Sequence, residues 1–231
     1  MPLKSDAAGV GKPTFDSGGV DRLIDGLVAD GYAVLPGALP DGLVRGLHTA
    51  ALARDAAGEA LDADIGRGGG AASASHVRVV RSAWLDGRGE AEAQFLALAE
   101  DLGIALNRNL MLGLFEFESQ FLIYDAGGFY ARHLDSFRGA RNRVVSMVVY
   151  LNPAWGEADG GGLLVWARDS DPDGPPALRV QPLAGTLVVM MSEEIPHQVE
   201  PACRQRVGIA GWWRINQSSG TRVDPPFTKR Y

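Results

Sequence analysis

The hydrophobic positions in the first half of the chain follow helical spacing. One stripe recurs at intervals of three and four residues and predicts an amphipathic helix that ends near Gly31. Its members are Val20, Leu23, Ile24, Leu27 and Val28. A second helix is predicted from about Pro40, with inward positions at Leu43, Val44, Leu47 and Ala51. The segment EAEAQFLALAEDLGIALN at 90–107 predicts a third helix, and YAVLPG at 32–37 and HVRVVRSAWLDG at 76–87 predict strands.

Beyond residue 114 the pattern changes to strand-like alternation. The segment at 114–124 is rich in phenylalanine, with Glu116 and Glu118 on the face opposite Phe115 and Phe117. Further strand-like runs occur at 128–135, 144–151, 163–167, 177–182, 186–191, 197–200 and 206–214. Clusters of glycine, proline, asparagine and aspartate separate these runs, which is typical of a β-sandwich or barrel. The order of elements therefore predicts an α+β fold, with helices first and an all-β half after them.

The organisation of the chain indicates one large domain. The first 19 residues are small and polar and predict a flexible N-terminal arm. We expect a single domain over 20–231, with its β core at about 114–214, because no repeat and no linker divides it.

The composition fits a globular protein and argues against nucleic acid or a membrane as partner. With 231 residues, 46% of them hydrophobic, the chain can bury a full core. The net charge is -6 and the pI about 5.2, so the protein lacks a strong positive field, although arginines gather at 137–143. We find no signal peptide and no apolar run near the roughly 18 residues that span a bilayer. The single cysteine, Cys203, fits a reducing compartment, so we expect a cytoplasmic protein.

Candidate metal ligands stand in GGFYARHLDSF at 127–137. On a strand, His133 and Asp135 would share a face and could reach one metal ion. The candidate third ligand is His197, which follows a proline at the start of a predicted strand, although an ordinary strand-edge histidine would give the same pattern. His48 lies beside the stripe of the second helix, and we interpret it as a half-exposed helix histidine.

These ligand types predict a particular chemistry. Two histidines and one carboxylate on one face of an iron ion leave three positions open, as in the non-haem Fe(II) oxygenases. A chelating 2-oxo acid can take two of them and dioxygen the third. The far carboxylate of such a cosubstrate needs a bidentate cation, and Arg206 leads into the apolar strand VGIAGWW, where a charge needs a partner. Tyr150 offers a hydroxyl from a strand that is otherwise apolar, or is an ordinary core tyrosine.

Three stretches closely resemble the prolyl-hydroxylase-like branch of the Fe(II)/2-oxoglutarate-dependent dioxygenases. They are FLIYDAGGFYARHLDSFRGARNRVVSMVVYLNPAW, DGGGLLVW and GTLVV…SEEIPHQVEPACRQRVGIAGWWR, within about 114–214. The resemblance implies a double-stranded β-helix, a jelly roll with N-terminal helices packed on one side. It also implies Fe(II), 2-oxoglutarate, dioxygen, and ascorbate as the reductant. The implied iron ligands are His133, Asp135 and His197, and the implied 2-oxoglutarate-binding residues are Arg206, Tyr150 and Tyr124.

The same resemblance implies a substrate-facing side. The matched positions are Arg143, Trp212, Arg78 and Trp84. Several relatives carry an arginine-glycine-aspartate run before the tryptophan matched by Trp84, whereas this chain reads Arg78-Val79-Val80-Arg81, which weakens the transfer of prolyl-peptide specificity. The glycine-rich segment DIGRGGGAASAS at 64–75 stands just before this strand. We expect it to be a mobile loop that closes over the substrate, with a plain connector as the alternative.

The leading expectation is an oxygenase that hydroxylates a C–H bond of a prolyl residue in a protein and releases succinate and CO2. One alternative with the same chemistry is hydroxylation of a free amino acid or another small molecule. A halogenase is disfavoured, because Asp135 would occupy the metal position that a halide needs. The remaining alternative is a catalytically silent jelly-roll binding module, against which Arg206 and Tyr150 argue. The sequence does not indicate an oligomeric state.

Overall fold

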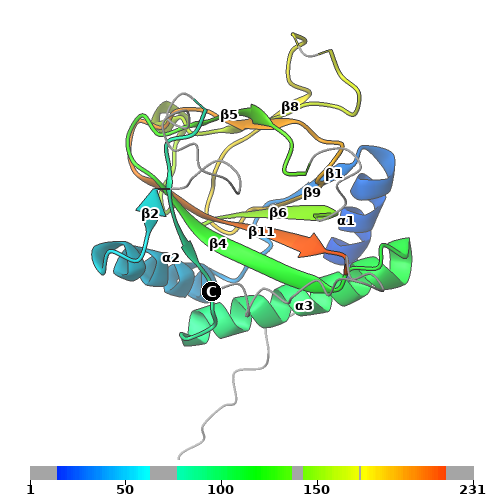
Figure 1. Cartoon of the computed structure of the whole chain (residues 1–231), viewed down its shortest axis with the longest axis horizontal. Coiled ribbons are helices and arrows are strands. Elements are labelled where there is room, and N and C mark those ends of the chain that lie inside the picture. The colour runs from blue at the N-terminus through cyan, green and yellow to red at the C-terminus, as the bar shows by residue number, and fades with distance from the viewer. Residues whose placement is uncertain (1–14, 63–76, 137–142, 172, 217–231) are drawn as a thin grey trace, which may run out of the picture.

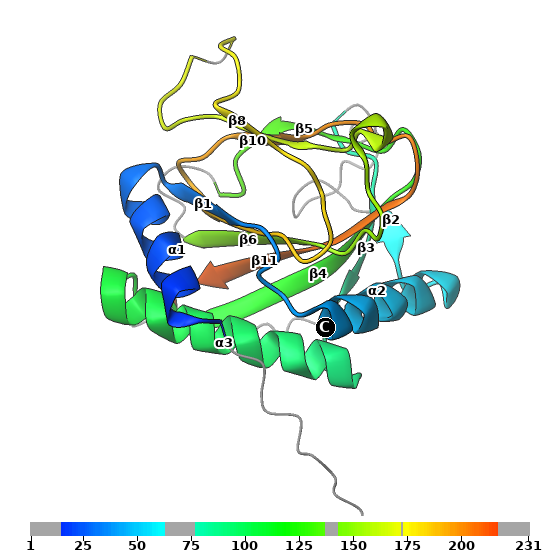
Figure 2. The ribbon, with the colours of Figure 1, turned by 180° about the vertical axis from the view of Figure 1, so that it is seen from behind.

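The computed structural model describes residues 15–62, 77–136, 143–171 and 173–216. Two β-sheets face each other, and the helices pack on the outer side and edge of the larger sheet (Figures 1 and 2). This arrangement is a double-stranded β-helix, so the α+β fold expected from the sequence is confirmed.

Within the described residues, three α-helices accompany the larger sheet. They are α1 (Ser17–Ala29), α2 (Asp41–Ala56) and α3 (Glu90–Leu110). The side chain of Asp16 caps α1 by accepting a hydrogen bond from the backbone N–H of Gly19, and Gly31, with φ of 81°, redirects the chain after it. Since α1 begins at Ser17, the last residues of the predicted N-terminal arm belong to this helix. None of the helices in the described residues is long and apolar enough to cross a bilayer.

The strands form two antiparallel sheets. The larger sheet contains β1 (Tyr32–Leu35), β9 (Leu187–Met191), β6 (Val145–Tyr150), β11 (Arg206–Arg214), β4 (Glu116–Tyr124), β3 (Arg81–Trp84) and β2 (Leu61–Asp62), in this spatial order. The smaller sheet contains β5 (Tyr130–His133), β10 (His197–Val199), β7 (Leu163–Val165) and β8 (Leu178–Val180). A short 3-10 helix, η2 (Glu157–Asp159), precedes β7.

Strand β11 shows how the sequence pattern creates the interior. Its residues alternate between two hydrophobic clusters. Ile209 and Trp213 pack with the helices, whereas Ala210 and Trp212 belong to the cluster between the two sheets. Arg206 has the same parity as Trp212, so this alternation directs its side chain into the space between the sheets.

Three sequence expectations need correction. Strand β5 ends at His133, and Asp135 lies in the bend that follows, so the two residues are not on one strand. The helix stripe is narrower than expected, because Val28 is 62% exposed. The two-residue strand β2 has no hydrophobic alternation and was not predicted. The expected lid at 64–75 lies outside the described residues.

Candidate metal centre and cosubstrate pocket

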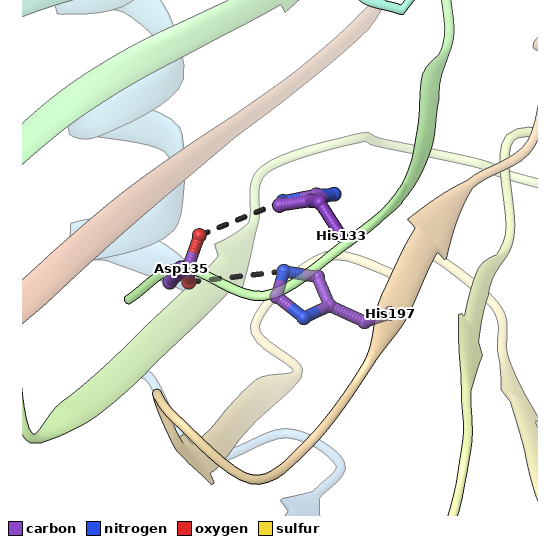
Figure 3. A group of neighbouring side chains, drawn as sticks. All are labelled: His133, Asp135 and His197. Carbon is purple, nitrogen blue, oxygen red and sulfur yellow. Dashed lines mark ion pairs between the residues drawn. The ribbon is translucent and has the colours of Figure 1, made fainter. Parts of the chain in front are cut away.

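Three metal-binding side chains converge at the smaller sheet (Figure 3). Pairing of β5 with β10 puts His133 directly opposite His197, and Asp135 joins them from the bend after β5. Asp135 Oδ1 lies 3.5 Å from His133 Nε2, and its Oδ2 lies 3.7 Å from His197 Nε2. One donor atom from each residue lies within 4.8 Å of the others. Two imidazoles and one carboxylate form a donor set that fits Fe(II).

Backbone contacts orient both imidazole rings. His133 Nδ1 lies 2.8 Å from the carbonyl oxygen of Ala131, and His197 Nδ1 lies 3.1 Å from that of Ile195. A carbonyl oxygen can only accept a hydrogen bond, so each neutral ring carries its proton on Nδ1. Each Nε2 then presents a lone pair toward the carboxylate of Asp135. Three electron-pair donors that face one another fit a shared cation, and this observation makes the cluster a candidate metal site.

The electrostatics of the cluster favour the metal-binding protonation states. Burial acts to raise the pKa of Asp135, but the positive charges that His197, His133 and Arg143 can carry outweigh it and hold that pKa well below its usual value. Burial and the neighbouring His133 lower the pKa of His197 to about 4, against the opposing effect of Asp135. At neutral pH the carboxylate is therefore ionised and the His197 ring neutral, as metal ligation requires.

Tyr130 is a site residue that the sequence analysis missed. Its ring stacks on that of His133, with centroids 3.5 Å apart and planes 15° from parallel. In a regular strand, residues 130 and 133 would point to opposite faces. Here His197 pairs with His133 and Val199 pairs with Tyr130, so β5 has one residue more than β10 over this interval. This bulge rotates both rings to the same side, and no periodicity in the sequence predicts it.

A second group of buried polar side chains lies between the sheets and fits a carboxylate ligand. Arg206 is 2% exposed and stands opposite Tyr124 in the pairing of β11 with β4. Its Cζ lies 4.9 Å from the ring centroid of Tyr124 and 5.1 Å from that of Tyr150. Arg206 Nε and both phenol oxygens are buried without a hydrogen-bond partner. Such atoms are rare in a folded core, and together they form a preorganised set of donors.

The two phenols remain neutral donors at physiological pH. Burial raises the pKa of Tyr150 to about 12, against the effect of Arg206. Burial also raises the pKa of Tyr124, whereas Arg206 and Arg78 act to lower it and Asp135 to raise it. Tyr124 and Tyr150 belong to the hydrophobic cluster against which Tyr130 packs, and Tyr130 stacks on His133, so the two groups of residues lie in one interior.

Gly161 is a further residue that the sequence analysis did not single out. It lies before β7 with φ of 67°, and a Cβ there would stand 2.9 Å from Ala202 Cβ and 3.0 Å from Arg206 Cδ. Glycine is required because a side chain would push against the arginine and because the backbone is left-handed. The run of glycines in DGGGLLVW was the available signal.

Three of the four predicted substrate-facing residues, Arg143, Trp212 and Arg78, take part in contacts between an arginine and an aromatic ring. The guanidinium of Arg143 lies 3.7 Å above the ring of Trp212, and that of Arg78 lies 4.8 Å from the ring of Tyr130. Burial raises the pKa of Tyr130; Arg78 and Arg143 act to lower this pKa, and Asp135 and Tyr124 act to raise it. Both arginines are thus within electrostatic range of the ring that covers His133.

The fourth predicted residue, Trp84, lies at the end of β3 and packs against the hydrophobic cluster between the sheets. On the same strand, Arg81 forms ion pairs with Asp55 at 2.9 Å and with Asp125. Arg81 therefore connects the end of α2 to the turn after β4, which is a structural role. His48 does not belong to the metal cluster and lines a separate surface pocket on α2.

Comparisons with known proteins agree with this geometry. The family model described as the 2OG-Fe(II) oxygenase superfamily matches residues 119–214. A prolyl-4-hydroxylase from Pseudomonas putida is 39% identical, with 85% of this chain and 98% of that chain covered at a TM-score of 0.75. The chain belongs to the 2OG-Fe(II) oxygenase superfamily.

Two further structures share the fold at lower identity. A prolyl hydroxylase from Trichoplax adhaerens, in complex with a hypoxia-inducible-factor peptide fragment, is 21% identical, with coverage of 84% and 88% and a TM-score of 0.74. The epimerase SnoN, in complex with Fe3+, alpha-ketoglutarate and nogalamycin RO, is 18% identical, with coverage of 91% and 94% and a TM-score of 0.60.

Membership of this oxygenase superfamily fixes the coarse function. The protein is a prolyl-hydroxylase-like, 2-oxoglutarate-dependent dioxygenase that uses Fe(II). The matched segment includes His133, Asp135, His197 and Arg206. A catalytically silent jelly-roll module is not supported, because such a module has no use for buried donors without partners.

Proposed function

We propose that this dioxygenase hydroxylates a prolyl residue of a protein or peptide. The proposal is carried by the facing electron-pair donors of the metal cluster, beside buried and unpaired carboxylate-binding groups. Its prolyl specificity is supported by 39% identity to the Pseudomonas putida prolyl-4-hydroxylase. The ring of Tyr130, which stacks on that of His133, puts an aromatic group beside the metal cluster, where a pyrrolidine ring could pack.

In the proposed mechanism, His133, Asp135 and His197 hold Fe(II) through His133 Nε2, His197 Nε2 and a carboxylate oxygen. The Nδ1–H groups of both histidines stay on backbone carbonyls, so the rings need no reorientation when metal binds. When bound, iron and 2-oxoglutarate supply the oxidation, in which dioxygen and 2-oxoglutarate give succinate, CO2 and a hydroxylated substrate.

Arg206, Tyr150 and Tyr124 would bind the 2-oxoglutarate carboxylate that does not chelate the metal. The guanidinium supplies charge and a planar fork of donors, and the two phenols each add one O–H donor. All three side chains are almost fully buried, which keeps water away from the cosubstrate.

On the substrate side, Arg143 and Trp212 would hold the substrate chain, while Arg78 and Trp84 border it from the strand β3 side. Hydroxylation of a small molecule or free amino acid is the second candidate. The observation in its favour is that Val79-Val80 stands in place of the glycine and aspartate of several relatives, so these two positions carry no carboxylate.

We also propose ascorbate as the reductant that keeps the iron ferrous, and a cytoplasmic location. The location is supported by the only cysteine, Cys203, whose thiol is free and exposed.

The test is incubation of the protein with Fe(II), ascorbate and 2-oxoglutarate in a cell extract, followed by tandem mass spectrometry. Under labelled dioxygen, we expect succinate release and a peptide that gains one labelled oxygen atom on proline. Labelled oxygen in a small molecule and in no peptide would favour the second candidate. Absence of succinate with any extract would contradict the assignment of the site.

A further inference from the structure

A buried carboxylate on β4 stands beside the substrate-facing side. Glu118 is 5% exposed and lies opposite Trp212 in the pairing of β4 with β11. The sequence pattern predicts only that Glu118 lies on the polar face of this strand, opposite Phe115 and Phe117. A carboxylate this deeply buried is costly unless a cation and hydrogen bonds accompany it.

Arg143 provides that cation. Its Nε lies 3.0 Å and its Nη2 2.9 Å from Glu118 Oε1. The Arg143 guanidinium also lies 3.7 Å above the ring of Trp212, a cation–π contact. Glu118 thus holds one edge of the guanidinium while the indole supports one of its faces. A long arginine side chain fixed at both places loses most of its rotamer freedom before any substrate arrives.

The pair of Arg143 and Trp212 is accessible to a ligand and has an unsatisfied hydrogen-bond donor. Arg143 keeps 26% of its side chain exposed, and Trp212 Nε1 is buried without a hydrogen-bond partner. Trp212 belongs to the hydrophobic cluster between the sheets, and Tyr130, whose ring stacks on His133, packs against the same cluster. The charge of Arg143 also acts on Asp135 and on Tyr130. A ligand that packs on this surface and accepts a hydrogen bond from the indole would satisfy the unpaired N–H.

We propose that Glu118 is a positioning and specificity residue that acts through Arg143, an inference that rests on the proposed prolyl hydroxylation. It holds the guanidinium flat on Trp212, and its negative charge offsets the positive charge of Arg143. The surface therefore selects a neutral acceptor, such as a peptide carbonyl, rather than an acidic side chain or a free carboxylate.

The test uses two synthetic peptides that carry the hydroxylated prolyl residue identified in the extract, with alanine or aspartate beside it. For Glu118→Gln, we expect KM for the alanine peptide to rise about five- to thirty-fold, as for the loss of one or two kcal/mol of positioning. We expect KM for the aspartate peptide to fall relative to that of the alanine peptide, because Arg143 is no longer neutralised. Dissociation constants for Mn(II) and 2-oxoglutarate should not change.

The matched control is Glu116→Gln. Glu116 lies two residues earlier on the same face of β4 and pairs with Arg214 at 2.6 Å, so this variant breaks a similar ion pair. It should leave both KM values unchanged. A double-mutant cycle completes the test, since Glu118→Gln should change KM little further in an Arg143→Leu background.

The possible results distinguish a positioning role of Glu118 from a structural role and from an error in the proposed substrate class. Equal effects of Glu118→Gln on both peptides, or equal effects with and without Arg143, would show that Glu118 is merely structural and overturn the inference. If Glu118→Gln does not fold, Arg143→Lys carries the test, because it removes the planar fork; an unchanged KM would then overturn the inference. Turnover of 2-oxoglutarate by the wild type without hydroxylation of any prolyl peptide would instead contradict the proposed substrate class.

Discussion

Replacement of Arg206 by leucine should weaken 2-oxoglutarate binding while it leaves the fold and the metal site intact. The side chain is 2% exposed, and its Nε lacks a partner in the protein. Leucine replaces the buried alkyl part of the arginine but carries no guanidinium to approach the rings of Tyr124 and Tyr150. Since substitution of a buried charged group by an apolar one of similar volume is often neutral or stabilising, the apoprotein should not lose stability.

The magnitude follows from the lost contact with the cosubstrate. A hydrogen bond to a charged group contributes about 1.5–3 kcal/mol, which corresponds to roughly a ten- to hundred-fold increase in Kd. At a ligand concentration of about 100 times the wild-type Kd, binding stabilises the folded protein by about 2.7 kcal/mol. A hundred-fold weaker variant would gain only about 0.4 kcal/mol at that concentration.

The assay is a titration with 2-oxoglutarate in the presence of Mn(II) and without oxygen, followed by calorimetry and thermal unfolding. Arg206→Lys serves as the partner variant, because it keeps the charge without the planar fork and should bind with intermediate affinity. Wild-type affinity in Arg206→Leu would place the carboxylate-binding group elsewhere. Equal loss of Mn(II) and 2-oxoglutarate binding would show that Arg206 supports the whole site rather than the cosubstrate.

Three further predictions follow from the geometry. Asp135→Ala should abolish hydroxylation and reduce the bound metal measured by elemental analysis, with little change in Tm; coupled hydroxylation by this variant would contradict the ligand assignment. Gly161→Ala should raise the Kd for 2-oxoglutarate, because the added Cβ would press on Arg206. Gly58→Ala is the control, since Gly58 has φ of 74° but an added Cβ there would meet no atom within 4 Å, and it should leave this Kd unchanged. Equal Kd values in the two variants would exclude contact with Arg206 as the cause. Arg54→Leu should destabilise the fold by about 3–5 kcal/mol in urea unfolding, because it leaves Glu92, 2% exposed and 2.7 Å from Arg54 Nη2, without that cation. A smaller loss would mean that the backbone N–H groups of Asp86 and Gly87 are sufficient partners for Glu92.

The sequence predicts the scaffold well because local patterns determine it. Strand β11 coincides with the predicted run at 206–214, and the inward residues expected for α2 are all buried. Both results depend on periodicity, which reports which face of an element is covered. The boundaries of β5 and the strand β2 were not predictable in this way, because pairing with distant strands decides where these short strands begin and end.

For the candidate site, the sequence likewise predicts which residues take part but not how they are arranged. His133, Asp135, His197 and Arg206 could be chosen from residue type and order, since few side chains bind iron or a carboxylate. Their actual arrangement depends on cross-strand register. Asp135 reaches the metal cluster from a bend rather than from the expected strand, and Tyr130 joins it through a bulge that makes residues three apart share a face.

Charge pairing is the least predictable part, and it is also where specificity is expected. In the sequence, Glu116 and Glu118 are equivalent polar positions of one alternating strand. In the fold, Glu116 pairs with Arg214 at the end of β11, whereas Glu118 pairs with Arg143 above Trp212, close enough to the metal centre for Arg143 to act on Asp135. The difference arises because register places Trp212 beside only one of the two glutamates. Two residues with the same local pattern can therefore have different partners, and the neighbouring strand decides which of them pairs with Arg143 beside Trp212.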